Sequence, residues 1–185
     1  RRAFMTEMAK LAGSVAAAEL VIAGIAASPA AAAQVASNDP RLTMRTQKLA
    51  GGYNAYVAEA RTRSLKPTVL VIHENRGLND HIRDVARRIA LAGYRAVAPD
   101  ILSPVGGTPA NEDSARELIG KLDLGKSVND ALAMIDELAR SSRGGKVGAV
   151  GFCWGGGFVN RLAIAAGQGL PDHQGQRFQP RPHPA

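Results

Sequence analysis

The sequence predicts an α/β fold in which helices cover both faces of a largely parallel sheet. Strand-like and helix-like segments alternate from residue 68 onward, and the strand-like segments are short and apolar throughout. Runs of this kind are typical of parallel strands that are buried on both faces. An alternating order also favours parallel pairing, because each helix carries the chain back to the start of the sheet. Together with a hairpin that precedes the alternating segments, the predicted domain spans residues 42–166.

An antiparallel hairpin opens this region. Residues 42–49 and 53–58 are strand-like, and the three small residues Ala50-Gly51-Gly52 lie between them. A few residues that include glycine, placed between two such runs, are typical of a hairpin turn. The next strand is predicted over 68–72, because its sequence TVLVI is dominated by β-branched residues.

A helix is predicted to begin after Asn79 and to end at Ala92. Asparagine is a favoured helix cap, and Gly93 supplies the stop signal. The apolar residues of this helix fall on one face, as a helix that packs on a sheet requires. The other predicted elements are a strand over 94–98 that Pro99-Asp100 ends, a Gly- and Pro-rich loop over 103–109, a helix over 112–122, a helix from Ser127 or Asn129 to Arg140, a strand over 146–152 and a helix from Gly155 to Ala166.

Residues 1–36 have the layout of an export signal rather than of a folded domain. The basic pair Arg1-Arg2 precedes an apolar stretch over 11–27, and a run of small residues over 28–33 follows. The arginine pair resembles a leader of the twin-arginine type. Glu19 interrupts the apolar stretch, so we expect no stable membrane span here.

This leader implies a partner and a location. We expect the bacterial twin-arginine export machinery to recognise it, cleavage at Ala33 or Ala36, and a periplasmic or secreted protein. The alternative is that the segment forms an Ala-rich amphipathic helix of the mature protein.

Residues 167–185 break the α/β pattern. Leu170 and Phe178 are the only large apolar residues, and Pro, Gln, Gly, Arg and His surround them. Such a segment is not expected to form a strand or to bury a face. We interpret it as an aberrant or disordered tail, which arises either naturally or from a shifted reading frame.

Composition excludes several classes of function. The chain of 185 residues carries 23 Lys and Arg against 16 Asp and Glu, a net charge of +7, but the basic residues are scattered and aromatic residues are 4% of the chain. We therefore expect no nucleic acid partner. The single cysteine, Cys153, argues against a disulfide framework, a Cys-based zinc site and a thiol-redox pair. No G-x-G-x-x-G loop follows the strand at 68–72, so a nucleotide-binding domain is not favoured.

The most specific motif is Gly151-Phe152-Cys153-Trp154-Gly155, which lies between a predicted strand and a predicted helix. It has the G-x-nucleophile-x-G pattern of a nucleophile elbow, with Cys153 as the nucleophile. The two glycines are needed because a Cβ atom at either position would clash with the neighbouring strand and helix. The helix N-terminus behind the sulfur favours a thiolate. The alternative is a buried and inert cysteine.

A second group of polar residues follows the strand at 68–72. In α/β-hydrolases the loop after this strand provides one amide of the oxyanion hole, and the residue after the nucleophile provides the other. The candidate donors are therefore the backbone N–H groups of Asn75 and Trp154. His73 ends a buried strand, where a hydrogen-bonded structural histidine is the usual outcome, and we assign it no catalytic role.

Two charged residues of this loop are further candidates. Glu74 is expected to lie close to Cys153, where its carboxylate can accept the thiol proton or hold the sulfur in a resting position. Arg76 is a candidate for substrate binding. The alternative for both is a solvated ion pair of the loop.

These residues resemble the dienelactone hydrolase family, carboxymethylenebutenolidase-like α/β-hydrolases with a Cys-His-Asp triad. The resemblance runs from about residue 42 to 164 and rests on six segments: 73–79 (HENRGLN), 84–88 (DVARR), 92–94 (AGY), 98–100 (APD), 106–107 (GG) and 151–156 (GFCWGG). It implies an α/β-hydrolase fold of which this chain holds the N-terminal part, without the later strands. It also implies hydrolysis of a small-molecule carboxylic ester or lactone by the elbow cysteine, with the glutamate after the third strand governing its resting state. No metal or other cofactor is implied.

The chain departs from the family in two places. The family carries its triad Asp and His on loops after later strands, whereas Asp172 and His173 of this chain lie in the tail with no strand to position them. We therefore expect this fragment to be inactive or impaired; the alternative is a non-catalytic degenerate fragment or a binding module that retains the pocket. The best-known members also use an arginine after the Pro-Asp turn, and residues 101–104 contain none, which argues against dienelactone itself as substrate.

Overall fold

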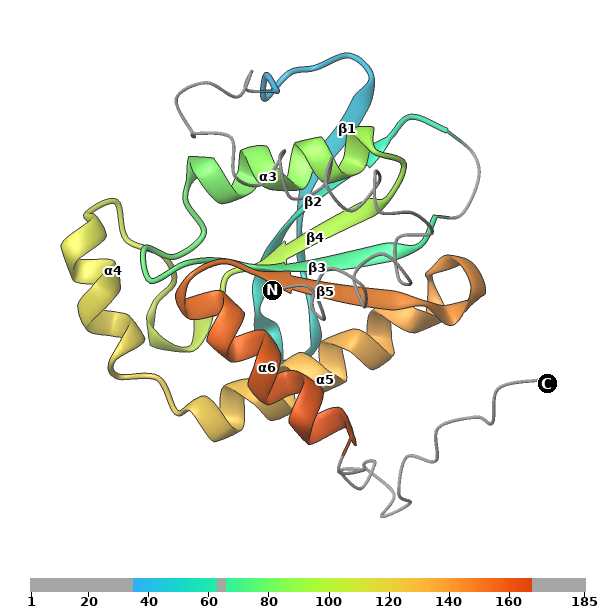
Figure 1. The fold of residues 1–185 in the computed structure, drawn as a ribbon. Helices are drawn as coiled ribbons and strands as arrows, with labels where there is room; N and C mark the ends of the chain where they lie inside the picture. Colours follow the sequence, from blue (N-terminus) through green and yellow to red (C-terminus); the bar gives the residue numbers. More distant parts are fainter. Residues whose placement is uncertain (1–34, 63–65, 168–185) are drawn as a thin grey trace, which may run out of the picture. The chain divides into compact units, whose positions relative to one another are not determined.

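The computed structural model describes residues 35–62 and 66–167 of the chain. They form a mixed five-stranded sheet with helices on both faces (Figure 1). In the order β1-β2-β4-β3-β5, the strands are β1 (Leu42–Lys48), β2 (Asn54–Ala60), β4 (Arg95–Pro99), β3 (Thr68–Ile72) and β5 (Val147–Gly151). The α/β fold predicted from the alternation of segments is confirmed.

The pairing of the strands divides the sheet into an antiparallel and a parallel part. β1 and β2 pair antiparallel, with Leu42 opposite Ala60, and a short 3-10 turn, η1 (Ala50–Gly52), joins them. β2 pairs antiparallel with β4, and β3 lies between β4 and β5, parallel to both. Within the described residues β5 pairs with β3 alone and is the outer strand on its side.

In the part of the chain that the structure describes, four helices accompany the sheet. They are α3 (Asp80–Leu91), α4 (Glu112–Ile119), α5 (Leu124–Arg140) and α6 (Trp154–Gly167). α3 covers one face of the sheet, and α5 and α6 cover the other (Figure 1). Alternate residues of β3 serve the two faces: Val71 packs with α3, whereas Leu70 and Ile72 pack with α5 and α6. β3 is thus buried on both faces, as its apolar sequence predicts.

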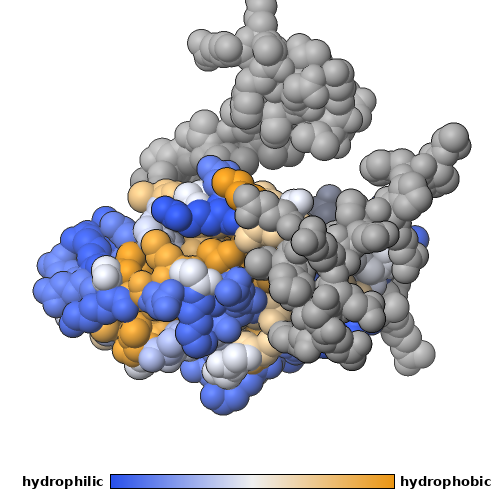
Figure 2. All heavy atoms as spheres, turned by 90° about the horizontal axis from the view of Figure 1, so that it is seen from below, coloured by the Kyte–Doolittle hydropathy of each residue, from blue (hydrophilic) through white to orange (hydrophobic). Residues whose placement is uncertain are grey.

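Apolar side chains also reach the surface. Figure 2 shows them in several places between hydrophilic residues. Ile164 of α6 is the most exposed of the large hydrophobic residues that the structure describes, at 60%, and Tyr94 follows at 42%.

Several helices and strands begin or end at residues other than the predicted ones. α5 begins at Leu124 rather than at Ser127 or Asn129, because the Asp123 side chain caps it by accepting from the Lys126 amide at 2.9 Å. The end of α4 lies at Ile119, not at residue 122, because the chain turns at Gly120. The helix of the elbow begins at Trp154 and the strand before it at Val147, each within one residue of the prediction.

The predicted terminal segments fall almost wholly outside the described residues. Of the leader over 1–36 the structure describes Val35 and Ala36, and of the tail over 167–185 it describes Gly167, the last residue of α6. Asp172 and His173 lie outside as well. Within 35–62 and 66–167, none of the helices combines the length and the apolar character that a membrane crossing needs.

Candidate active site

The elbow between β5 and α6 has the backbone conformation that a nucleophile elbow requires. Cys153 has a φ of 50°, and it is the one non-glycine residue with positive φ among the residues that the structure describes. Such a conformation costs on the order of 1 kcal/mol or more, and it persists where the surrounding structure enforces it. The side chain is exposed, which contradicts the alternative of a buried, inert cysteine.

Two glycines enforce this turn. A Cβ atom on Gly151 would lie 2.0 Å from the carbonyl oxygen of Gly155. A Cβ atom on Gly155 would lie 2.6 Å from the carbonyl oxygen of Ile72 and 2.5 Å from that of His73. The first contact sets how tightly α6 folds back on β5, and the second sets how closely α6 approaches the end of β3. The steric requirement expected from the motif is thus met at both positions.

The register between β3 and β5 brings the elbow and the loop after β3 to the same edge of the sheet. Ile72 pairs with Gly151 at the ends of these parallel strands. Counting on from this pair, Glu74 and Cys153 are both two residues beyond it. The Phe152 amide donates to the Ile72 carbonyl at 3.4 Å and extends the ladder into the elbow.

The two amides that the sequence singles out are free to bind a ligand. Within the described part of the chain, neither Asn75 N–H nor Trp154 N–H donates a hydrogen bond, whereas Gly77 N–H donates to Glu74 at 3.3 Å and Gly155 N–H donates to Phe152 at 2.8 Å. Trp154 is the first residue of α6, and the first amides of a helix have no partner within it and are suited to an anion.

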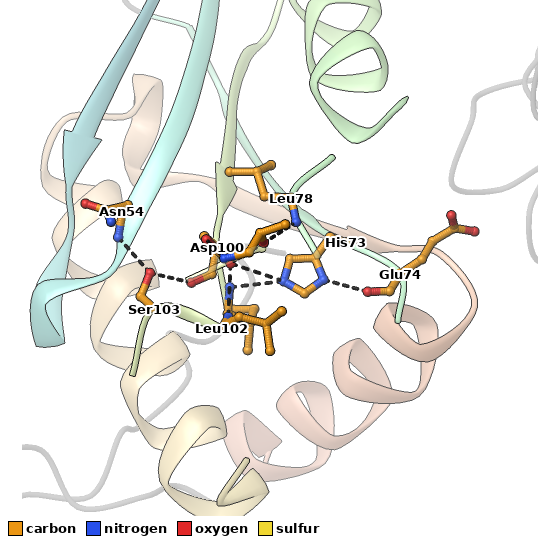
Figure 3. A network of polar contacts seen from close by, with 9 residues as sticks. Asn54, His73, Glu74, Leu78, Asp100, Leu102 and Ser103 are labelled. Carbon is orange, nitrogen blue, oxygen red and sulfur yellow. Dashed lines mark hydrogen bonds and ion pairs between the residues drawn. The ribbon is translucent and has the colours of Figure 1, made fainter. Parts of the chain in front are cut away.

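The two charged candidates behave differently. Glu74 is half-buried, and its carboxylate makes no hydrogen bond or ion pair with any residue that the structure describes; in Figure 3 it points away from His73. Arg76 is exposed and pairs with Glu112 of α4 at 3.1 Å, with the two side chains 45% and 49% exposed. For Arg76 the loop ion pair is what the structure contains, whereas Glu74 has no such partner.

His73 is buried and both of its ring nitrogens are engaged. Nε2 lies 3.1 Å from the Ile101 amide, and Nδ1 lies 2.6 Å from the Glu74 carbonyl oxygen (Figure 3). An amide can only donate, so Nε2 accepts, and the proton is on Nδ1, which donates. Burial lowers the pKa of His73, in agreement with a neutral ring. The 3.9 Å approach of Nε2 to Asp100 is therefore not an ion pair. The structural role predicted for this histidine is confirmed.

Asp100 holds the loop after β4 and links it to the loop after β3. Its carboxylate accepts from the Leu102 amide at 3.1 Å and from both the amide and the hydroxyl of Thr108 at 2.8 Å. The Thr108 hydroxyl oxygen in turn accepts from the Leu78 amide at 2.8 Å. A Cβ atom on Gly77 would lie 2.3 Å from that oxygen. Sequence reasoning recorded the Pro-Asp turn but missed Thr108, which lies in an irregular loop without a period to mark it.

An aromatic contact joins the two loops of the site. The rings of His73 and Trp154 stack with their centroids 5.8 Å apart and their planes 16° apart. The Trp154 ring also packs against the Phe158 ring of α6, with the two ring centroids 5.4 Å apart. The residue that carries the second free amide is therefore packed directly on the buried histidine.

Comparison with known proteins agrees with this arrangement. Residues 53–170 match the dienelactone hydrolase family. A protein of Escherichia coli described as "Putative hydrolase fragment YghX" is 47% identical over 100 residues, which are 51% of this chain and 86% of that protein. A "Putative carboxymethylenebutenolidase" of a Synechocystis species is 35% identical over 112 residues, 56% of this chain and 46% of that protein.

A solved structure gives the same result for the fold. The crystal structure of a "Putative Dienelactone Hydrolase" from Klebsiella pneumoniae superposes with a TM-score of 0.59 at 27% identity, over 66% of this chain and 54% of that one. This chain therefore spans about half of that structure, and the expected α/β-hydrolase type of fold is confirmed as a partial one.

Proposed function

Since the chain belongs to the dienelactone hydrolase family, we propose that it attacks small carboxylic esters or lactones through Cys153. One observation carries this proposal: an exposed cysteine in a positive-φ turn lies at the same sheet edge as two unpaired amides. A nucleophile beside preorganised donors is what acyl transfer requires.

The proposed chemistry has two halves. The Cys153 thiolate adds to the carbonyl carbon, and the amides of Asn75 and Trp154 donate to the oxyanion of the tetrahedral intermediate. When the intermediate collapses, the C–O bond breaks, the thioester forms, and the alcohol leaves with the proton that the thiol had given up. Water then attacks the thioester, releases the acid and restores the thiol. We assign Glu74 as the group that accepts the thiol proton, because its carboxylate has no partner among the described residues.

The second half is where we propose that this chain is impaired. Deprotonating the attacking water needs a base near the thioester. His73 does not supply it, because both its nitrogens are engaged. Glu74 is a poor base for this step, because a carboxylate takes a proton from water far less readily than from a thiol, which is the stronger acid. We therefore propose that the chain forms the thioester and hydrolyses it slowly. Slow hydrolysis of the thioester also favours the second candidate function, a fragment that binds ligands at the site without turnover.

The test is a stopped-flow measurement with p-nitrophenyl acetate. We expect a burst of one p-nitrophenolate per chain, followed by slow release, and a protein that gains the mass of one acetyl group at Cys153. The Cys153→Ala variant serves as the control and should show neither. Equal p-nitrophenolate release from both proteins would rule out attack by Cys153 and favour the non-catalytic candidate function.

We also propose that the leader is removed before Val35 when the protein is exported to the periplasm or secreted. Two backbone contacts support this boundary: the Val35 amide donates to Asp84 at 2.7 Å, and Arg87 Nε donates to the Val35 carbonyl at 2.6 Å. Cleavage after Ala33 keeps both contacts, and cleavage after Ala36 removes them. The mass of the exported chain distinguishes the two sites, and an uncleaved cytoplasmic chain would contradict the proposal.

A further inference from the structure

We propose that His73 is a positioning residue for the oxyanion hole: it orients the amide of Asn75 by a hydrogen bond and supports Trp154 by stacking. This inference rests on the proposed function, and it says what holds the two oxyanion donors in place. His73 does not touch the substrate in this proposal. It acts through the two backbone groups that do.

The first step is that His73 holds the peptide group that contains the Asn75 amide. Nδ1–H donates to the carbonyl oxygen of Glu74 at 2.6 Å. That carbonyl and the N–H of Asn75 belong to one planar peptide unit, in which they point in opposite directions. Fixing the oxygen on one side therefore fixes the direction of the N–H on the other.

The second step is that the histidine is itself fixed. Nε2 accepts from the Ile101 amide at 3.1 Å, so the ring cannot turn over without losing a buried hydrogen bond. The ring is fully buried, and the Asp100 carboxylate beside it is held by three other donors. The direction of the Asn75 amide thus depends on the buried turn after β4.

The third step links the same residue to the second donor. The His73 ring stacks on Trp154, and the space at Gly155 lets α6 approach the His73 carbonyl closely. The elbow and the loop after β3 therefore both pack against His73. A preorganised pair of donors needs such a common reference, because catalytic geometry is sensitive to small displacements.

Two variants separate the contacts of His73. His73→Asn places an amide nitrogen where Nδ1 lies, so it retains a donor for the Glu74 carbonyl and loses the acceptor for Ile101. His73→Gln reaches the Nε2 position with its oxygen, so it retains that acceptor and loses the donor. Comparing them distinguishes the orientation of the peptide from a general loss of packing.

The measurement compares two reactions of the same thiol. Acylation of Cys153 by p-nitrophenyl acetate passes through an oxyanion, whereas alkylation by iodoacetamide does not, so the ratio of the two rates reports the oxyanion hole alone. Removing an oxyanion donor costs about 100- to 1,000-fold in rate, and misorienting one in His73→Gln is expected to lower the ratio by about tenfold or more. His73→Asn keeps the donor for the Glu74 carbonyl but loses the stack on Trp154, so it should lower the ratio less than His73→Gln does. Leu42→Ala, in the buried cluster of β1 and away from the site, should lower thermal stability and leave the ratio unchanged.

Each outcome decides between the proposals. An unchanged ratio in His73→Gln, with the burst intact, would overturn the role of His73 and leave the proposed function standing. If the unsubstituted protein is alkylated at Cys153 but not acylated, the proposed function fails and this inference fails with it. If the variants do not fold, the unsubstituted protein still tests the proposal. Imidazole ¹⁵N spectra should show a neutral His73 with its proton on Nδ1. A proton on Nε2 would overturn the proposal.

Discussion

Two turns at the same edge of the sheet use their hydrogen-bonding groups in opposite ways. The turn after β4 is buried around Asp100, whose carboxylate is shared by the donors of Leu102 and Thr108. The turn after β5 is strained at the exposed Cys153, and the Trp154 amide is left without a partner in the described structure. We expect the first turn to contribute stability, whereas in the proposed function the second holds reactive groups at the expense of stability. The loop after β3 lies between the two, and His73 connects them.

The largest expected effect is the loss of the Asp100 carboxylate. In Asp100→Ala, the amides of Leu102 and Thr108 and the Thr108 hydroxyl lose their acceptor in a buried turn. Each unsatisfied donor costs about 1–3 kcal/mol, so the free energy of unfolding should fall by at least about 3 kcal/mol in urea titrations. Asp136→Ala, at an exposed position of α5, is the control and should change it by less than about 0.5 kcal/mol. Equal losses in the two variants would show that the turn after β4 is not the stabilising one.

Relieving the strained turn should have the opposite sign. Cys153→Gly gives the elbow a residue that tolerates positive φ, and it should raise the free energy of unfolding by about 1 kcal/mol while abolishing acylation. Cys153→Ala, which keeps a Cβ atom at the same φ, is the matched control for the loss of the thiol. The contrast between the turns would be lost if the glycine variant were no more stable than the alanine variant.

Acid should weaken the connection between the turns. Burial lowers the pKa of His73 below its ordinary value of 6.5, so below that pH the unfolded chain binds more protons at this residue than the folded one does. The stability due to neutral His73 is complete above pH 6.5 and is lost as the pH falls towards the folded-state pKa. Urea titrations across this range should show a steeper decline for the unsubstituted protein than for His73→Gln. Parallel declines would contradict a buried neutral ring.

The smallest effect is expected at Arg76. Its ion pair with Glu112 is exposed on both sides, so Arg76→Ala should lower the free energy of unfolding by less than about 1 kcal/mol. If Arg76 binds substrate, the same variant should slow acylation by an ester that carries a carboxylate and leave a neutral ester unaffected. Arg116→Ala, which removes an exposed pair within α4, is the control. A loss of stability similar to that of Asp100→Ala would place Arg76 in the structural group.

The sequence predicted the elbow better than it predicted its support. Glycines at fixed spacing around Cys153, between a strand and a helix, carry a local signal, and the structure has the turn where that signal places it. The bonds from His73 to Ile101 and from Leu78 to Thr108 join residues 28 and 30 positions apart. Contacts of this kind follow no period and arise only when neighbouring strands bring their ends together. For the same reason, a polar side chain outside the helical pattern, that of Asp123, decided where α5 begins.

The two turns also differ in how the strands that lead to them are held in the sheet. Within the described residues this strand is hydrogen-bonded to β3 on one flank, whereas β4, which carries the Asp100 turn, is bonded on both. Fluctuations of a sheet are largest at its rim, where a strand can separate from one neighbour without disturbing another. Within the described residues, the sulfur atom therefore follows a strand that is hydrogen-bonded on one flank only. In this part of the chain, the ladder to β3 and the close contacts at Gly151 and Gly155 are what hold the turn at Cys153 in place.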